Sequence, residues 1–279
     1  MQWRSYFRLM RFHKPVGIFL LWWPTAWALW IATGGTPGMK LVIYFSLGTV
    51  FMRAAGCVIN DLADRNFDRH VQRTAARPLT TGEVSLFEGL VLTCLLLVAS
   101  LFILLQLPGP CFYYAVAALG VTVLYPFCKR FFQAPQFVLG IAFSMGIPMV
   151  YAAAGVPFNH SFILLLLINF AWIVAYDTMY AMVDREDDLR IGIKSTAILF
   201  ASYDRVIIFA LQVFFHGLWL VLALLNHYSF KFYILWLAGA GYLAEQQILV
   251  NTRQDNACFK AFTTNVWYGC CMWLALILS

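Results

Sequence analysis

Four long stretches without a charged residue constrain this chain more than any other feature of its sequence. They cover residues 15–39, 89–128, 131–176 and 206–230 and are 25, 40, 46 and 25 residues long. Roughly 20 apolar residues are enough for one helix to cross a bilayer. Only 11% of the residues are charged, whereas a soluble domain carries about 25%. The sequence therefore predicts a polytopic membrane protein and argues against a water-soluble fold.

The predicted spans are helices. They lack the alternation of polar and apolar residues that marks membrane barrel strands, and a helix closes its backbone hydrogen bonds within one segment. Proline and glycine residues, for example at 34–38 and 108–110, divide the stretches. We predict an all-α fold, one integral-membrane domain over residues 1–279 with nine transmembrane helices. The spans are 16–33, 41–59, 86–107, 110–127, 135–155, 160–180, 205–225, 230–250 and 262–278.

The distribution of basic residues predicts the orientation, because Lys and Arg in short loops stay in the cytoplasm. With a cytoplasmic N-terminus, only Lys40 and Lys231 of the 19 basic residues lie on the other side. The same orientation places all 13 acidic residues on or near the cytoplasmic side. The net charge of +6 then reflects topology and needs no nucleic-acid partner.

Two acidic clusters lie at predicted cytoplasmic helix ends. The first contains Asn60, Asp61, Asp64 and Asp68, which fall within about 100° of one another on a helix that turns 100° per residue. Three carboxylates and an amide therefore share one face.

The second cluster begins at Asp177. Asp184 and Asp188 follow it by seven and eleven residues and fall within about 40° of one another on a continuous helix. Glu186 and Asp187 point elsewhere. The spacing predicts a second stripe of three carboxylates on one helix.

Carboxylates stacked in this way repel one another unless a ligand binds. Oxygen ligands without nearby His or Cys suit Mg²⁺, which proteins hold with a few carboxylates and substrate phosphates. The alternative is a solvated loop with scattered acids. The metal is favoured because the spacing of Asp64 and Asp68 recurs 120 residues later in Asp184 and Asp188. The implied ligand is a diphosphate bridged by Mg²⁺.

Basic residues accompany both clusters and would neutralise a diphosphate; the alternative is ordinary loop charge that sets topology. They are Arg65, Arg69, Arg73, Arg77 and Lys194. Arg53 lies inside an apolar span, where an arginine is costly and faces a cavity or a partner. We expect it to bind an anion; the alternatives are snorkelling and pairing with a cluster acid.

Aromatic rings near the cytoplasmic helix ends are candidates to stabilise a developing cation, although most aromatic residues serve packing and the membrane interface. The candidates are Tyr125, Tyr176 and Tyr180. The five His residues lack ligand spacing, and the seven Cys residues include no CxxC pair. We interpret both sets as structural.

The motifs Asn60-Asp61-x-x-Asp64-x-x-x-Asp68 and Asp184-x-x-x-Asp188 resemble the two signature motifs of the UbiA superfamily of intramembrane prenyltransferases. The likeness spans almost the whole chain, and His13 and Thr80-Thr81 depart from the usual pattern outside these motifs. Further similar stretches include Lys14-Pro15-Val16-Gly17, Arg53-Ala54-Ala55-Gly56-Cys57, Arg77-Pro78-Leu79, Tyr125-Pro126-Phe127, Lys129-Arg130, Tyr176-Asp177-Thr178 and Ile191-Gly192-Ile193-Lys194.

The resemblance implies nine helices around a central cavity in a bacterial inner membrane, with both motifs at the cytoplasmic mouth and the C-terminus in the periplasm. It implies Mg²⁺-dependent transfer of a polyprenyl group from polyprenyl diphosphate to C3 of 4-hydroxybenzoate, in ubiquinone synthesis. Loose association with other enzymes of that pathway is compatible with this location. The implied metal ligands are Asp61, Asp64, Asp68, Asp184 and Asp188.

The remaining site residues are assigned on the same basis. Asp177 or Asp184 would orient or deprotonate the acceptor phenol, and Arg53 would hold the acceptor carboxylate. The substrate-binding set is Arg53, Asn60, Arg65, Arg69, Arg77, Tyr125, Lys129, Arg130, Tyr180 and Lys194.

Two other functions stay open at this point. Another aromatic acceptor, such as dihydroxynaphthoate or homogentisate, would use the same site. A cation-coupled transporter would also place carboxylates in a helical bundle, but its coupling acids should lie near the membrane midplane, whereas these acids lie at one face.

Overall fold

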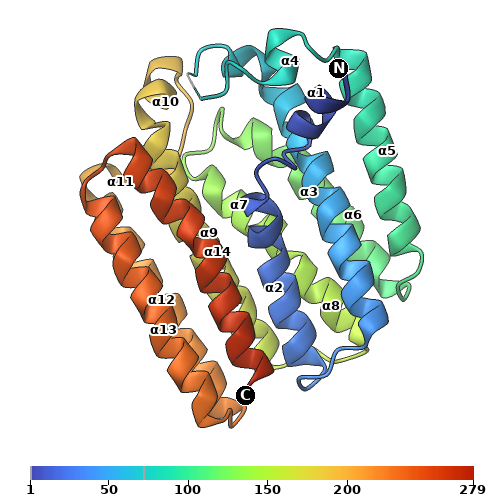
Figure 1. The fold of residues 1–279 in the computed structure, drawn as a ribbon, viewed down its shortest axis with the longest axis vertical. Coiled ribbons are helices and arrows are strands. Elements are labelled where there is room, and N and C mark those ends of the chain that lie inside the picture. The colour runs from blue at the N-terminus through green and yellow to red at the C-terminus, as the bar shows by residue number, and fades with distance from the viewer. Residues whose placement is uncertain (1, 72) are drawn as a thin grey trace.

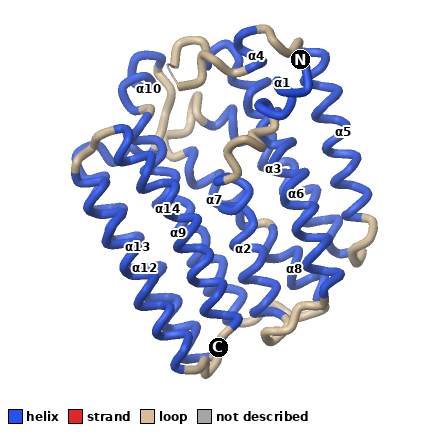
Figure 2. The backbone as a smooth tube through the Cα atoms, viewed as in Figure 1, coloured by secondary structure: helices blue, strands red, loops and turns tan. Residues whose placement is uncertain are grey.

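The computed structural model describes residues 2–71 and 73–279, and these residues form a helical bundle without strands (Figures 1 and 2). The all-α prediction is therefore confirmed. The helices are α1 (Gln2–Leu9), α2 (Val16–Ala32), α3 (Met39–Asp68), α4 (Pro78–Thr81), α5 (Leu86–Leu104), α6 (Pro110–Cys128), α7 (Pro135–Ser144), α8 (Gly146–Ala154), α9 (His160–Val183), α10 (Arg185–Ile191), α11 (Thr196–Phe200), the 3₁₀ turn η1 (Ala201–Tyr203), α12 (Asp204–Leu225), α13 (Phe230–Asn251) and α14 (Asp255–Ile277).

Six helical segments of the described chain are long and apolar enough to cross a membrane. α2 is a shorter apolar helix. Each of the nine predicted spans is helical, while their number as membrane crossings stays a prediction. The six segments are Met39–Asp68, Leu86–Leu104, Pro110–Cys128, Pro135–Ala154, His160–Val183 and Thr196–Leu225.

The span predicted over residues 135–155 is interrupted at Met145, between α7 and α8. Pro148 lies in α8, and a proline has no N–H to donate to the carbonyl four residues earlier, which belongs to Ser144. The predicted span nevertheless holds, since Pro135–Ala154 is one of the six segments long and apolar enough to cross a membrane; the proline accounts for the local interruption.

α9 lies at the centre of the main hydrophobic core. α9 carries apolar residues on all of its faces, as expected for a helix that is buried on most sides. Trp172 of α9 packs against Trp27 of α2, with ring centroids 4.9 Å apart, and Trp27 packs edge-on against Trp219 of α12 at 5.2 Å. The large rings therefore fix α9 between α2 and α12.

The ends of the bundle differ in composition. The N-terminus and the short helices α1, α4 and α10 lie at one end, and the C-terminus lies at the other (Figure 1). Both acidic clusters are at the end that carries α4 and α10, because α3 ends at Asp68 and α9 ends at Val183. All seven cysteines are free. The side of the membrane that each end faces stays a prediction.

Candidate active site

α3 carries the first acidic cluster on a single helix. The helix continues past the predicted boundary at residue 59 and ends at Asp68. Asp61, Asp64 and Asp68 are all buried. The predicted convergence of three carboxylates on one face therefore agrees with the structure.

Basic side chains hold these carboxylates. Arg77 donates to Asp68 at 2.6 Å and lies 3.0 Å from Asp61, so it bridges two turns of the motif. Arg11 donates from Nη2 to Oδ1 of Asp61 at 2.7 Å. The pairing compensates charges that would be costly to bury alone.

Lys129 brings α6 to the first motif, since its Nζ lies 3.6 Å from Oδ2 of Asp64. It follows the last residue of α6 and lies 5.3 Å from the centre of the Tyr125 ring. Two predicted substrate-binding residues, Tyr125 and Lys129, therefore do lie at the motif.

The second acidic cluster does not form one continuous stripe. α9 ends at Val183 and α10 begins at Arg185, with Asp184 between them in a non-helical conformation. The prediction of a single helix from Asp177 to Asp188 is wrong. The interruption coincides with ion pairs that draw the two neighbouring residues to different segments: Asp184 binds Arg73, and Arg185 binds Asp204.

Arg73 connects the two motifs. Its Nε and Nη2 donate to the carboxylate of Asp184 at 2.9 and 2.5 Å, and its guanidinium lies 4.7 Å from the centre of the Tyr180 ring. Asp68 lies within electrostatic range of the same guanidinium. The segment after α3 therefore closes onto the end of α9.

Asp188 has no direct ion pair with a basic side chain among the described residues, unlike Asp184. Partial burial, with a further contribution from the negative charge of Asp184, raises the pKa of Asp188 to about 7. The positive charges of Lys129 and Arg73 act in the opposite direction. A cation bound beside Asp188 would stabilise its ionised form and release a proton.

The carboxylate and amide oxygens of the two motifs are ligands that suit a hard divalent cation. In this structure, basic side chains bind several of these carboxylates. Within residues 2–71 and 73–279, no three acidic, His or Cys side chains lie close enough to ligate one ion together. Oδ2 of Asp61 and Oδ1 of Asn60 are buried and have no hydrogen-bond partner. Oxygen acceptors of this kind suit Mg²⁺. Binding would require Arg77 and Arg73 to release their carboxylates.

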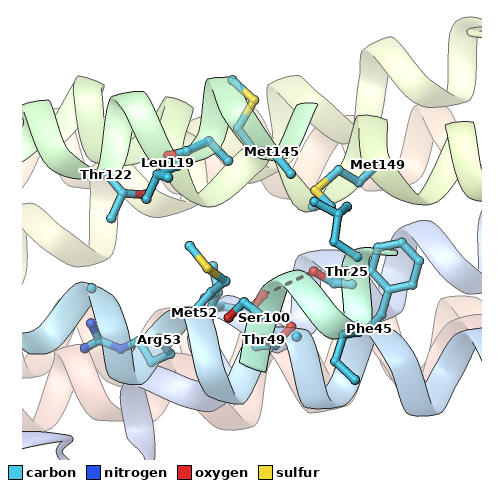
Figure 3. A pocket seen from close by; sticks show the side chains of 18 of the residues that line it. Thr25, Phe45, Thr49, Met52, Arg53, Ser100, Leu119, Thr122, Met145 and Met149 are labelled. Atoms are coloured by element: carbon cyan, nitrogen blue, oxygen red, sulfur yellow. Dashed lines mark hydrogen bonds between the residues drawn. The ribbon is translucent and has the colours of Figure 1, made fainter. Parts of the chain in front are cut away.

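An apolar cavity of about 470 Å³ extends along α3, between helices α2, α5, α6, α7 and α8 (Figure 3). Its lining on α3 runs from Tyr44 to Gly56, and Gly56 precedes Asn60 by one turn, about 6 Å. Val98 and Leu101 of α5 and Phe112 of α6 line the cavity and are exposed at the surface. The cavity therefore opens between α5 and α6.

Arg53 is the charged residue in this lining (Figure 3). Among the described residues it makes no ion pair or hydrogen bond, and its guanidinium lies 5.9 Å from the centre of the Phe143 ring. A Cβ at Gly17 would lie 2.3 Å from Nη2 of Arg53, so the guanidinium lies directly against this glycine of α2. Pairing of Arg53 with a cluster acid, one of the two alternatives to anion binding, is not observed among the described residues. An intramembrane arginine without a partner favours an anionic ligand.

Asp177 and Tyr176 lie deeper on α9, and both are buried. The charges of Lys129 and Arg53 act on Asp177, as does that of Asp184. The hydroxyl of Tyr176 is buried without a hydrogen-bond partner. Tyr180, the third predicted aromatic residue, packs against Phe262 in a tilted arrangement, with ring centroids 4.7 Å apart.

Four predicted substrate-binding residues have other surroundings. Arg65 donates to the carbonyl of Leu79 at 3.0 Å, and Arg130 donates to the carbonyl of Ala63 at 2.9 Å. Arg69 and Lys194 are exposed. Lys194 lines a separate surface pocket, and its backbone N–H donates to the carbonyl of Lys129 at 2.8 Å. Their contact with a substrate stays a prediction.

Two contacts of the motifs were not foreseen in the sequence. The sequence pattern does not single out Arg11, and it marks Arg73 only as one of several basic residues near the acidic clusters. Neither position carries a local signal, because its partner is 50 residues away for Arg11 and 111 residues away for Arg73.

Residues 21–277 match the UbiA prenyltransferase family. A 4-hydroxybenzoate octaprenyltransferase of Legionella pneumophila (strain Lens) is 60% identical over 277 residues, which cover 99% of this chain and 98% of the relative. A protein of the same name from Serratia proteamaculans (strain 568) is 49% identical over 279 residues, which cover 100% of this chain and 96% of the relative.

Two solved structures are similar in fold. A UbiA homolog from Aeropyrum pernix K1, in an apo structure, has a TM-score of 0.81 at 20% identity, covering 94% of this chain and 96% of its own. A UbiA homolog from Archaeoglobus fulgidus, bound to GPP and Mg²⁺, has a TM-score of 0.74 at 20% identity, covering 98% of this chain and 99% of its own.

Proposed function

The chain belongs to the UbiA prenyltransferase family, and from this premise we propose that it transfers a polyprenyl group from polyprenyl diphosphate to C3 of 4-hydroxybenzoate. The product is 3-polyprenyl-4-hydroxybenzoate. The observation that carries the proposal is the meeting of two aspartate motifs beside an apolar cavity whose lining contains the unpaired Arg53. The names of the two bacterial relatives support the choice of substrates.

The proposed site needs a cation beside the diphosphate. Asp61, Asp64 and Asp68 of α3 would hold Mg²⁺ together with Asp184 and Asp188. When bound, Mg²⁺ supplies Lewis-acid polarisation and a template for the diphosphate. The Mg²⁺ in the Archaeoglobus fulgidus structure supports this choice of metal.

The chain's own residues supply the rest of the chemistry. Arg77, Arg73 and Lys129 lie within reach of the carboxylates and would bind the oxygens of the leaving diphosphate once the carboxylates turn to the cation. The apolar walls keep water away from the allylic cation. The acceptor ring attacks that cation ortho to its hydroxyl and then loses the ring proton. Asp177 or Asp184 orients or deprotonates the phenol.

The hydrocarbon tail of the donor would occupy the apolar cavity. Val98, Leu101 and Phe112 line the cavity where it opens between α5 and α6. A tail longer than the cavity would continue through this opening into the bilayer, so donors of several chain lengths would fit.

The position of the site relative to the membrane follows from charge. Seventeen of the 19 basic residues lie on or near the end that carries the motifs in the predicted topology. We therefore place this end in the cytoplasm of a bacterial inner membrane.

The direct test uses purified protein in detergent with 4-hydroxybenzoate, Mg²⁺ and geranyl diphosphate as a short soluble donor. We expect mass spectrometry to detect a 3-prenyl-4-hydroxybenzoate whose formation stops with EDTA and resumes with excess Mg²⁺. We expect this because the aspartate carboxylates and the diphosphate are all negatively charged and repel one another unless a cation lies between them. Metal-independent product would contradict the proposed metal role.

The same assay separates the acceptors. Dihydroxynaphthoate and homogentisate are supplied in competition with 4-hydroxybenzoate at equal concentration. Prenylation of one of these in preference to 4-hydroxybenzoate would leave the fold and the metal site intact and would overturn the choice of acceptor.

Arg53→Ala is expected to raise the apparent KM for 4-hydroxybenzoate by about 10- to 100-fold, because a hydrogen bond to a charged group contributes about 1.5–3 kcal/mol. The KM for the donor should change little. Steady-state kinetics with each substrate varied in turn check this split. Lys40→Ala is the matched control, since Lys40 is an exposed basic residue at the other end of α3. A defect confined to the donor would remove Arg53 from the acceptor site.

A further inference from the structure

Asp204 is a buried carboxylate that the proposed reaction does not use. It is the first residue of α12 and is 0% exposed. Its Oδ1 accepts hydrogen bonds from the backbone N–H of Arg205 at 2.7 Å and from Nη2 of Arg253 at 2.8 Å. Its Oδ2 accepts a short hydrogen bond from Nη2 of Arg185. One carboxylate therefore ties together the start of α10, the start of α12 and the turn between α13 and α14.

The ion pair between Asp204 and Arg185 lies directly beside the second motif. Arg185 follows Asp184, the residue at which the helical path of α9 is interrupted. Arg73 holds Asp184 from one side through two hydrogen bonds, while Asp204 holds Arg185 from the other. Two consecutive residues are thus fixed by partners on different segments, and this determines where Asp184 lies.

Polar contacts hold α10 at its start and just after its end. None of its residues is buried, so no hydrophobic core fixes its position. Its start is held through Arg185, and the segment after it is held by the hydrogen bond from the N–H of Lys194 to the carbonyl of Lys129 at 2.8 Å. These two polar contacts therefore help to fix the position of Asp188, in the middle of α10.

The backbone around Asp204 is strained on two sides. Arg253 has a φ of +54° and Ala201 has a φ of +47°, both in a region that residues with a side chain seldom adopt. Nη2 of Arg253 also donates to the carbonyl of Ser202 at 3.0 Å. Strain of this kind persists where the surrounding contacts enforce it. The ion pair between Arg253 and Asp204 is such a contact.

We propose that Asp204 is a positioning residue for the second aspartate motif. Through Arg185 it fixes the end of α9 and the start of α10, so that Asp184 and Asp188 face the first motif. The catalytic meaning of this inference rests on the proposed function, whereas the position of α10 can be measured without any reaction.

The first test is hydrogen–deuterium exchange, read by mass spectrometry, of the purified protein without Mg²⁺. In Asp204→Asn, the amides of residues 185–194 are expected to exchange about tenfold faster than in the wild type, because charged hydrogen bonds that hold this segment are lost. Arg253→Gln leaves the Arg185 pair in place and should show a smaller increase in the same residues. This second variant keeps the test decisive if Asp204→Asn does not fold.

The second test is the Mg²⁺ dependence of prenyl transfer. Asp204→Asn should raise the Mg²⁺ concentration for half-maximal activity by about 10- to 100-fold, as expected for a partner that orients metal ligands, with kcat at saturating Mg²⁺ largely retained. A change of stability alone would lower the active fraction without moving this concentration.

Lys260→Ala is the matched control. Lys260 of α14 forms a 3.0 Å ion pair with Glu245 of α13. The side chain of Lys260 is 61% exposed. The variant should leave both the exchange of residues 185–194 and the Mg²⁺ dependence unchanged.

Unchanged exchange in residues 185–194 of the folded variants would overturn the proposal, as would an increase spread evenly over all helices. If the wild-type protein failed to prenylate any acceptor, the proposed function would fall, and the exchange comparison would still decide the role of Asp204.

Discussion

Asp184→Asn is expected to slow prenyl transfer by about a thousandfold in a protein that stays folded, since groups that stabilise developing charge contribute about 10²–10³ in rate. The substitution keeps the size of the side chain and removes its charge. Arg73 would then lose the carboxylate that it binds at 2.9 and 2.5 Å. Single-turnover formation of the prenylated product, with thermal unfolding measured in parallel, gives the two quantities needed.

Glu186→Gln is the control for this variant. Glu186 lies two residues from Asp184, but its side chain is 89% exposed and its nearest cationic partner, Arg190, is 3.8 Å away. An exposed pair of this kind contributes little, so activity should stay close to that of the wild type. Full activity of Asp184→Asn would exclude Asp184 from the metal site. An equal loss in both variants would indicate a general effect of charge on α10.

Arg77→Ala is expected to destabilise the protein by about 3–5 kcal/mol in the absence of Mg²⁺, which is the usual cost of leaving a buried charge without its partner. Arg77 is bonded to Asp68 at 2.6 Å and to Asp61 at 3.0 Å, and both carboxylates are buried. Arg11 still compensates Asp61 at 2.7 Å, so most of the loss should come from Asp68. Denaturant unfolding in detergent measures the free energy.

Mg²⁺ should restore part of the stability of Arg77→Ala. A cation that binds the folded state stabilises it, and in this variant Arg77 no longer competes for Asp61 and Asp68. The rise in Tm on adding Mg²⁺ should therefore exceed that of the wild type. Arg8→Ala, which removes an exposed pair with Glu83, should show the wild-type response. A variant as stable as the wild type, with no larger response to Mg²⁺, would contradict the buried pairing.

The helices could be predicted from the sequence because the uncharged stretches and the residues that divide them are local features. The same local reasoning placed Asp61, Asp64 and Asp68 on one face, since α3 keeps its helical period to its end. The interruption at Met145 was also predictable, because Pro148 removes one hydrogen bond of the helix.

The interruption at Asp184 could not be predicted in this way. It coincides with contacts to Arg73, 111 residues away, and from Arg185 to Asp204, 19 residues away, and such contacts leave no periodic signal. The roles of loop arginines are hidden for a similar reason. Topology alone requires basic residues in these loops, and only the folded chain separates Arg77, which binds two carboxylates, from Arg65, which binds a carbonyl.

The order of these contacts along the chain has a consequence for biosynthesis. Asp184 is held by Arg73, and its neighbour Arg185 is held by Asp204, which in turn is held by Arg253. Chains are made and inserted from the N-terminus, so the first motif is complete long before Arg253 leaves the ribosome. A nascent or truncated protein lacking α14 and the turn before it would contain both aspartate motifs without the full set of ties that arranges them. We therefore expect the second motif to be held by its full set of contacts only after the turn between α13 and α14 has been made.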